Sequence, residues 1–180
     1  KSGAVKVVCG QGIAPRKLSI EHCRSLGLDL VPGSGLLATC IPGTFDALLL
    51  TLRDYGTASL RAVLEPAIFY ARHGYPVVER ITATIATVAE LFAKEWPTSA
   101  ALYLPGGNPP APGSIFRNLK LADTYERLLL EAESAGGDRD RQIEKARRVW
   151  SEGFVAEHID RFCRTQELMD SSGRRNKGVL

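Results

Sequence analysis

The sequence predicts a mostly helical chain with a few short strands. Long stretches repeat apolar residues every three or four positions, which is the spacing of an amphipathic helix. Glycine and proline fall mainly between these stretches and end them. Two short apolar runs near the amino terminus have the length and composition of buried strands. Together these patterns favour capped helices over a continuous sheet.

Two strands and one short helix are expected before residue 42. Residues 4–9 (AVKVVC) are rich in β-branched side chains and predict a first strand. Residues 35–41 (GLLATCI) are short and apolar and predict a second strand. Between them, Ser19 can cap a helix over residues 20–26, and Gly27 follows its end.

Two further helices are expected on either side of Gly56. Thr44 is a suitable N-cap for a helix that continues to about residue 55, where Gly56 ends it. Ser59 can cap the next helix, which ends at His73. Pro66 lies inside that pattern, where a proline costs about 3 kcal/mol and removes one backbone hydrogen bond. This helix should therefore bend, or break into a turn and a helix that starts near Pro66.

The rest of the chain predicts four more helices joined by turns. They cover residues 79–95, 121–134, 139–150 and 154–169, and Asp138 caps the third of them. Residues 104–113 (LPGGNPPAPG) predict a rigid, turn-rich connector. A proline-rich ligand for SH3-like domains is the alternative for this segment. The locally basic residues 173–177 predict a solvated tail.

Length, composition and charge fit one ordinary domain. The chain has 180 residues, of which 44% are hydrophobic and 24% charged, as in most globular proteins. The net charge of +3 is too small to indicate a nucleic-acid or anionic-membrane partner. No apolar run is long enough to span a bilayer. Because the chain begins at Lys1 and not at Met, we expect a piece of a longer protein, cytoplasmic, periplasmic or secreted.

The four cysteines do not predict a metal site. Cys9, Cys23, Cys40 and Cys163 lack the CxxC spacing of zinc ligands and have no paired histidines nearby. We expect buried or half-buried reduced thiols, with disulfides as the open alternative.

No local motif supplies catalysis or holds a cofactor. The Gly10-Gln11-Gly12 run lacks the third glycine of a dinucleotide fingerprint, and Pro15 follows it. The three histidines lie on separate predicted helices without HExxH spacing, and no two carboxylates form an evident acid–base pair. We therefore predict no catalytic residue, no metal and no cofactor within this chain.

Several motifs in register are similar to those of one enzyme family. They are Gln11-Gly12-Ile13-Ala14-Pro15, then Gly35-Leu36-Leu37-Ala38 leading into Ile41-Pro42-Gly43, then Tyr55-Gly56-Thr57, Leu64-Glu65-Pro66-Ala67, Leu104-Pro105-Gly106-Gly107, Asn118-Leu119-Lys120-Leu121-Ala122, the stretch from Val149 to Ala156, and Asp170-Ser171-Ser172-Gly173. In this order and spacing the chain resembles the central part of the large subunit of the gamma-glutamyltranspeptidase family.

The resemblance implies an N-terminal-nucleophile hydrolase of the α/β class. The full protein would be a four-layer αββα sandwich, and residues 1–180 would be a single, predominantly α-helical segment with a few short strands. The family precursor cleaves itself, and the new N-terminal Thr attacks the gamma-glutamyl amide of substrates such as glutathione. That Thr would lie beyond Leu180, so the chain alone should be inactive. The other large-subunit segments and the small subunit would be its partners.

Two residues of this chain could contact substrate. In the motif that the family often shows as Arg-Glu-x-Ala-Pro, the Arg pairs with the α-carboxylate of the substrate, and Gln11 stands at that position. A neutral amide cannot supply the charged fork of arginine, and losing such a partner costs roughly 2–5 kcal/mol in a closed site. An altered acyl-group preference is therefore expected. Arg16, just after Pro15, is the second candidate for contact with the substrate, with a surface role as the alternative.

The alternative from another class is a non-catalytic, degenerate family member that serves binding or assembly. Gln11 in place of the family's Arg is its main support. A Thr-containing segment followed by a Gly-Gly pair beyond residue 180 would favour the enzyme.

Overall fold

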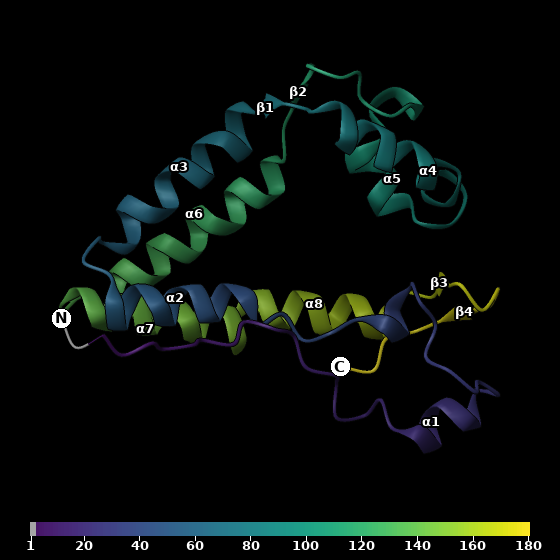
Figure 1. The fold of residues 1–180 in the computed structure, drawn as a ribbon, viewed down its shortest axis with the longest axis horizontal. Helices are drawn as coiled ribbons and strands as arrows, with labels where there is room; N and C mark the ends of the chain where they lie inside the picture. The colour runs from purple at the N-terminus through teal and green to yellow at the C-terminus, as the bar shows by residue number, and fades with distance from the viewer. Residues whose placement is uncertain (1–2) are drawn as a thin grey trace. The chain divides into compact units, whose positions relative to one another are not determined.

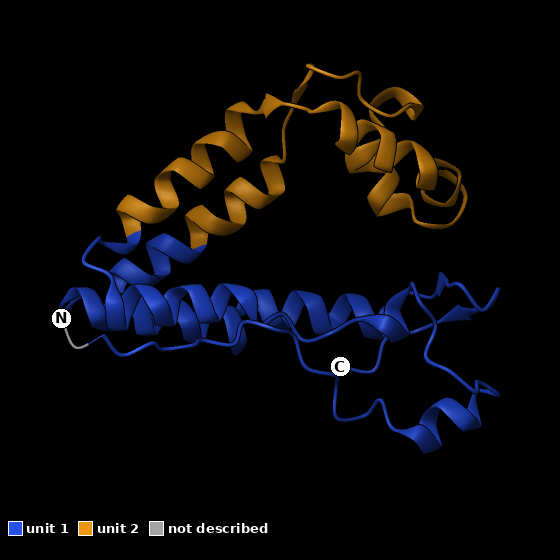
Figure 2. Cartoon of the chain, in the orientation of Figure 1, with its two compact units in different colours: residues 1–60, 128–180 blue, residues 61–127 orange. Residues whose placement is uncertain are grey.

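The computed structural model describes residues 3–180. The chain forms two compact units, one from residues 1–60 and 128–180 and the other from residues 61–127 (Figure 2). The boundary falls inside two helices, because α3 (Leu60–His73) and α6 (Leu119–Ser134) both cross it. Each unit is described by itself below.

The first unit is built on the packing of α2 (Thr44–Tyr55) against α7 (Arg139–Ser151), which α8 (Phe154–Thr165) extends (Figure 1). Both helices bury apolar stripes, and Ile143 and Ala146 of α7 are fully buried. Phe45 of α2 stacks on Trp150 of α7 with ring centroids 4.2 Å apart. The α2–α7 pair therefore forms the centre of this unit.

One arginine closes the carboxyl end of α2. Arg139 donates from Nε to the Ala58 carbonyl at 2.8 Å and from Nη2 to the Gly56 carbonyl at 2.8 Å. It also donates to the carbonyls of Leu52 and Arg53. The Leu52 carbonyl also accepts from the Gly56 amide at 3.0 Å. The helix ladder ends there, so Arg139 supplies a donor to the Arg53, Gly56 and Ala58 carbonyls.

Shorter elements complete the first unit. They are α1 (Ile20–Ser25), the 3₁₀ turn η1 (Leu36–Ala38), and the strands β3 (Leu168–Met169) and β4 (Arg175–Asn176). The two strands pair antiparallel. Buried Asp170 organises the turn between them, because its carboxylate accepts from the Ser172 amide at 2.8 Å, from the Ser172 hydroxyl at 2.6 Å and from Asn176 Nδ2 at 2.7 Å.

The second unit holds α3 from Arg61 onward, α6 up to Arg127, and a helical lobe. The lobe contains α4 (Glu79–Glu95), α5 (Pro97–Tyr103) and the 3₁₀ turn η2 (Pro105–Gly107). Strands β1 (Tyr75–Pro76) and β2 (Ile115–Phe116) pair antiparallel, with Tyr75 opposite Phe116. Arg72 of α3 joins α6 through Asp123 at 3.0 Å and Glu126 at 2.8 Å.

Most helix predictions are confirmed. The helix over residues 79–95 has the predicted bounds, and Ser19 and Asp138 cap α1 and α7 by accepting from the amides of His22 and Arg141. Thr44 is not a cap but the first residue of α2, and its hydroxyl donates to the Gly10 carbonyl at 2.9 Å. The last predicted helix was too long, because α8 ends at Thr165 and residues 168–169 pair as β3.

Both predicted N-terminal strands were wrong. Residues 4–9 form no ladder, and Val5 and Val7 are 87% and 88% exposed, because no other strand of the described residues pairs with them. The second segment turns at Gly35, whose φ of 87° starts the 3₁₀ turn η1. A single bridge, Ile13 to Ile41, remains. Strands need partners, and the local sequence cannot supply them.

Three other predictions have mixed outcomes. Pro66 lies within one continuous helix, α3, so the helix does not break there. The basic tail is not simply solvated, since Arg175 and Asn176 pair as β4 and Arg174 Nη1 donates to the Leu26 carbonyl at 2.6 Å. All four cysteines are free, and burial is confirmed for Cys23 and Cys163 but wrong for Cys9 and Cys40, which are exposed. No helix among residues 3–180 is both long and apolar enough to cross a membrane.

Candidate functional site

The predicted substrate residue Gln11 lies on an extended segment that runs along the start of α2. The Ile41 amide donates to the Ile13 carbonyl at 2.9 Å, and the Thr44 hydroxyl donates to the Gly10 carbonyl. These two hydrogen bonds fix the backbone on both sides of Gln11. The Gln11 side chain itself is exposed, so it is free to meet a ligand.

Glycines allow this segment to approach the α2 turn closely. A Cβ on Gly12 would lie 2.8 Å from both Cys40 Cβ and the Ile41 carbonyl oxygen. A Cβ on Gly43 would lie 2.9 Å from the Gln11 carbonyl oxygen. Such distances are below normal contact, so any side chain at either position would force the two segments apart. The position that the family motif fills with Glu is therefore restricted to glycine here.

Arg16, the other predicted substrate residue, belongs to a separate turn. The Leu18 amide donates to the Pro15 carbonyl at 3.0 Å, and this turn presents Arg16 to solvent while Pro15 is buried. No hydrogen bond joins Arg16 to Gln11 within the part of the chain that the structure describes. Gln11 and Arg16 therefore lie on one continuous segment, but no hydrogen bond brings them together.

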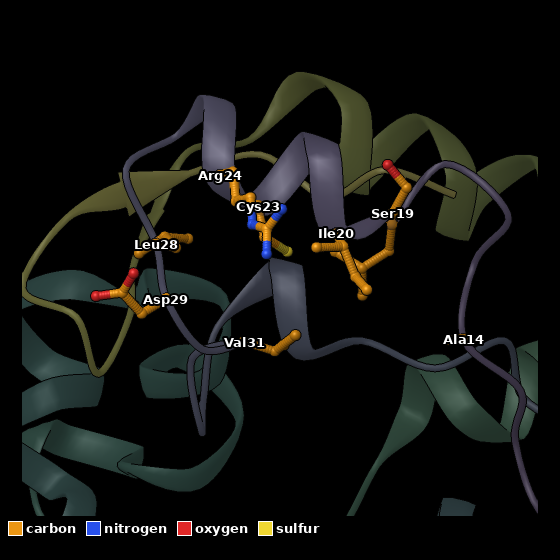
Figure 3. A pocket seen from close by; sticks show the side chains of 9 residues that line it. Ala14, Ser19, Ile20, Cys23, Arg24, Leu28, Asp29 and Val31 are labelled. Atoms are coloured by element: carbon orange, nitrogen blue, oxygen red, sulfur yellow. The ribbon is translucent and has the colours of Figure 1, made fainter.

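A cavity of about 450 Å³ opens beside α1, just past Ala14 (Figure 3). The sequence reasoning missed it. Its walls come from three consecutive pieces of chain: the turn before α1, α1 itself and the loop after it. The lining residues are Ala14, Leu18, Ser19, Ile20, Cys23, Arg24, Leu28, Asp29 and Val31. The only signal in the sequence was the Ser19-capped helix with apolar residues on both flanks, which does not by itself predict a hollow.

The wall of this cavity is anchored to a small core. Buried Cys23, Leu28 and Leu37 pack together, with Leu18 and Val179 against them. Arg174 contributes from the β3–β4 hairpin through its bond to the Leu26 carbonyl. The cavity is thus held by contacts from distant parts of the sequence.

A second, more apolar hollow of about 300 Å³ borders the Pro42 turn. Its lining includes Ile41, Pro42, Trp150, Ala156 and Ile159. It therefore lies next to the turn that supports the Gln11 segment, at the junction of α7 and α8.

The described residues hold no evident catalytic constellation. Among residues 3–180 no group of three or more His, Cys, Asp or Glu side chains could hold a metal ion. The ring nitrogens of His73 and His158 contact carbonyls of their own helices, Phe69 at 3.1 Å and Phe154 at 2.6 Å. Burial raises the pKa of the Cys163 thiol, which disfavours the reactive thiolate.

Known proteins resemble this chain over most of its length. The gamma-glutamyltranspeptidase family matches residues 1–165. The "Glutathione hydrolase-like YwrD proenzyme" of Bacillus subtilis is 31% identical over 157 residues, which are 87% of this chain and 27% of the relative. The "Acylase ACY 1 proenzyme" of Pseudomonas sp. (strain V22) is 37% identical over 111 residues, 61% of this chain and 20% of the relative.

Solved structures agree with this. The structure of LmbA2991T421A is 52% identical with a TM-score of 0.94, and the match covers 99% of this chain and 30% of that one. The gamma-glutamyltranspeptidase of Helicobacter pylori shares the fold at 24% identity, with a TM-score of 0.68 over 86% of this chain and 41% of that one.

The chain spans only about a quarter of its first curated relative. The predicted fold class is confirmed: this is a mostly helical chain with few short strands, and it shares its fold with a gamma-glutamyltranspeptidase and a cephalosporin acylase. With the family match over residues 1–165, the chain belongs to the gamma-glutamyltranspeptidase family.

Proposed function

We propose that residues 1–180 are a single segment of the large subunit of a gamma-glutamyltranspeptidase-like enzyme. The full-length enzyme would cleave or transfer the gamma-glutamyl group, or a related acyl group, of amides such as glutathione. Membership of the family supports this proposal, as do relatives whose names describe a glutathione hydrolase and an acylase.

The chemistry would come from an N-terminal Thr outside this chain. In that scheme the Thr hydroxyl attacks the amide carbonyl, the α-amine of the same Thr takes the proton, and backbone amides stabilise the oxyanion. The acyl group then passes to water or to another amine. The chain alone is therefore proposed to be inactive.

Gln11 is proposed to set the acyl-group preference of the enzyme. The observation that carries this is its placement: an exposed amide side chain on a backbone that Gly43 and Thr44 hold from behind. The amide group of Gln11 donates only neutral hydrogen bonds, where arginine would offer a charged fork. Glutamine in place of arginine should therefore weaken the binding of gamma-glutamyl groups more than the binding of acyl groups without an α-carboxylate.

Arg16 is proposed as a second substrate contact. It is exposed five residues downstream on the same segment, and its guanidinium is a cation within this region of the family motif. Its charge would attract an acidic substrate, but Arg16 lies outside the hydrogen bonds and glycine contacts that fix the backbone around Gln11.

A donor comparison in the full-length enzyme tests the role of Gln11. Gamma-glutamyl and 4-aminobutanoyl anilides differ only in the α-carboxylate, which is the group that an arginine would recognise. Gln11→Arg should raise kcat/KM for the gamma-glutamyl donor about tenfold relative to the 4-aminobutanoyl donor, because a charged fork replaces a neutral amide. Gln166→Arg, at an exposed position after α8, is the matched control and should leave the ratio unchanged.

Two results would count against this assignment. A strong native preference for the gamma-glutamyl donor would show that Gln11 does not weaken recognition of the amino-acid group. An equal response of the two arginine variants would show a general charge effect and not a contact.

A non-catalytic binding or assembly module is the second candidate, and the neutral Gln11 favours it. The two functions separate in one assay of the full-length protein. Self-cleavage followed by release of the anilide supports the enzyme, whereas a precursor that stays intact and inert supports the module. Turnover by residues 1–180 alone would contradict the proposed location of the nucleophile.

The proposed partners are the other large-subunit segments and the small subunit of the same precursor. Exposed apolar side chains support this proposal, since Leu48 of the first unit and Phe69 of the second are 63% and 54% exposed. Exposed apolar surface of this kind is typical of faces that another polypeptide covers.

A further inference from the structure

We propose that the cavity beside α1 is a binding site for a small monocarboxylate with an apolar body. The inference rests on this cavity alone and goes beyond the acyl transfer proposed above, which places no ligand there. Its volume of about 450 Å³ lies within the roughly 300–1,000 Å³ that small-molecule sites occupy.

The walls of the cavity are apolar and already in place. Ile20 and Val31 lie at the rim and are 67% and 49% exposed. Cys23 and Leu28 are buried, each only 8% exposed. Covering the exposed apolar side chains around this buried apolar floor with an apolar ligand removes them from water and makes the free energy of binding more favourable. This part of the site selects the hydrocarbon body of a ligand.

One cation is directed into this apolar space. In Figure 3 the Arg24 guanidinium and the Cys23 sulfur point toward the hollow between Ile20 and Val31. The Asp29 carboxylate, the only acidic group in the lining, points away from them. No ion pair involving Arg24 occurs among residues 3–180. A guanidinium so placed matches the two oxygens of a carboxylate.

Arg24 is not needed to complete its own helix. The carbonyls at the end of α1 already accept from backbone amides: His22 from Leu26, Cys23 from Leu28, and Arg24 from Gly27. The Leu26 carbonyl, just past the end of α1, accepts from Arg174. Because these acceptors are occupied, the Arg24 guanidinium is left for a ligand.

The single guanidinium also indicates the charge of that ligand. Arg24 is the only cationic side chain in the lining, so one negative charge is matched and a second would remain unpaired. A monocarboxylate is therefore favoured over a phosphate ester or a dicarboxylate.

Calorimetric titration of the full-length protein with hexanoate, hexanol and hexylamine tests the proposal. The three probes share one apolar body and differ in charge. Hexanoate should bind at least about tenfold more tightly than hexanol, as one charge-assisted hydrogen bond would give, and hexylamine should bind more weakly than both. Equal affinity for hexanoate and hexanol, or no binding of hexanoate, would overturn the proposal.

Variants locate the site on these residues. Arg24→Gln should remove the preference for hexanoate over hexanol, whereas the matched control Arg161→Gln, exposed on α8, should keep it. Val31→Phe, at a half-exposed rim position, should fill the cavity and weaken both ligands. If Arg24→Gln and Arg161→Gln behave alike, the carboxylate binds elsewhere.

Thiol footprinting gives an independent readout. Hexanoate should slow alkylation of Cys23, which lines the cavity, and leave Cys9 unaffected, because Cys9 is exposed outside it. Peptide mapping by mass spectrometry compares the two thiols in one sample. Equal alkylation of Cys23 with and without hexanoate would contradict binding at this cavity.

Discussion

Arg147 of α7 grips both carboxylate oxygens of Asp46 on α2. Its Nε lies 2.7 Å from Oδ1 and its Nη2 lies 3.1 Å from Oδ2, while Nη1 reaches Glu144 Oε2 at 2.9 Å. The two side chains of the forked pair are only 21% and 35% exposed. Two helices that are distant in sequence are therefore joined by a bidentate and partly shielded ion pair.

Removing this fork should destabilise the first unit. Arg147→Met keeps much of the aliphatic stem but loses the paired hydrogen bonds, and we expect the free energy of unfolding to fall by about 1–2 kcal/mol. Urea denaturation measures the change. Arg164→Met breaks an exposed pair with Asp160 within α8 and should cost less than about 0.5 kcal/mol. Equal costs would show that the bridge between helices adds nothing.

Arg139 should contribute more to stability than its neighbours on α7. Arg139→Ala removes the guanidinium donor from the Arg53, Gly56 and Ala58 carbonyls at and just past the end of α2, and we expect a loss of about 1–3 kcal/mol. Arg148→Ala, exposed on the same helix, is the control and should change the free energy of unfolding by less than about 0.5 kcal/mol. Thermal unfolding followed by circular dichroism separates the two. A silent Arg139→Ala variant would mean that water replaces the guanidinium at no cost.

Gly12 should not tolerate even one methyl group. In Gly12→Ala the new Cβ would meet Cys40 Cβ and the Ile41 carbonyl at 2.8 Å, and forcing the segments apart should cost about 1–3 kcal/mol. Gly33→Ala is the matched control, because the nearest atom to its Cβ would be Ser171 Oγ at 3.7 Å. Unfolding midpoints in urea compare them. Similar midpoints would indicate that the Gln11 segment moves away freely.

Asp170 should make stability depend on acid. Burial opposes its ionisation, but the hydrogen bonds from Ser172 and Asn176 outweigh burial and hold the pKa of Asp170 below its ordinary value. A group whose pKa is lower in the folded state stabilises the fold above its unfolded pKa, about 3.9, and loses that contribution as the pH falls through the folded pKa.

The comparison of Asp170→Asn with the native chain tests this. The variant should be less stable by a constant amount above about pH 5, and the deficit should shrink as the pH falls below about 4. Urea titrations at pH 7, 5 and 3 provide the values. Asp29→Asn, in an exposed loop, should show no comparable deficit at pH 7. A deficit that does not change down to pH 3 would mean that the amide destabilises the turn for reasons other than the loss of charge.

Local signals in the sequence predicted the helices but not what joins them. Ser19 and Asp138 were identified as caps because a capping side chain and the backbone amide that donates to it lie three residues apart. The strands failed because pairing depends on distant partners, and Gly35 diverted one of them into a turn. The role of Arg139 was not predictable, since its carbonyl partners lie more than 80 positions away.

For the candidate site, too, the sequence predicts what is local but not the contacts between distant residues. The Gln11 position could be found from the order of motifs, whereas the close approach of Gly12 to Cys40 and Ile41 becomes visible only in three dimensions. The cavity beside α1 combines residues 14–31 with support from Arg174 and Val179 at the other end of the chain. No window of sequence contains both parts.

The glycine contacts around Gln11 have a consequence for how this protein can change. The glycines at positions 10, 12 and 43 lie so close to neighbouring atoms that a larger residue would displace them. The Gln11 side chain is exposed beside these glycines, so it can be exchanged while the backbone around it keeps its place. Substitution at position 11, by design or by natural variation, can therefore change the donor preference, whereas the glycines beside it tolerate little change.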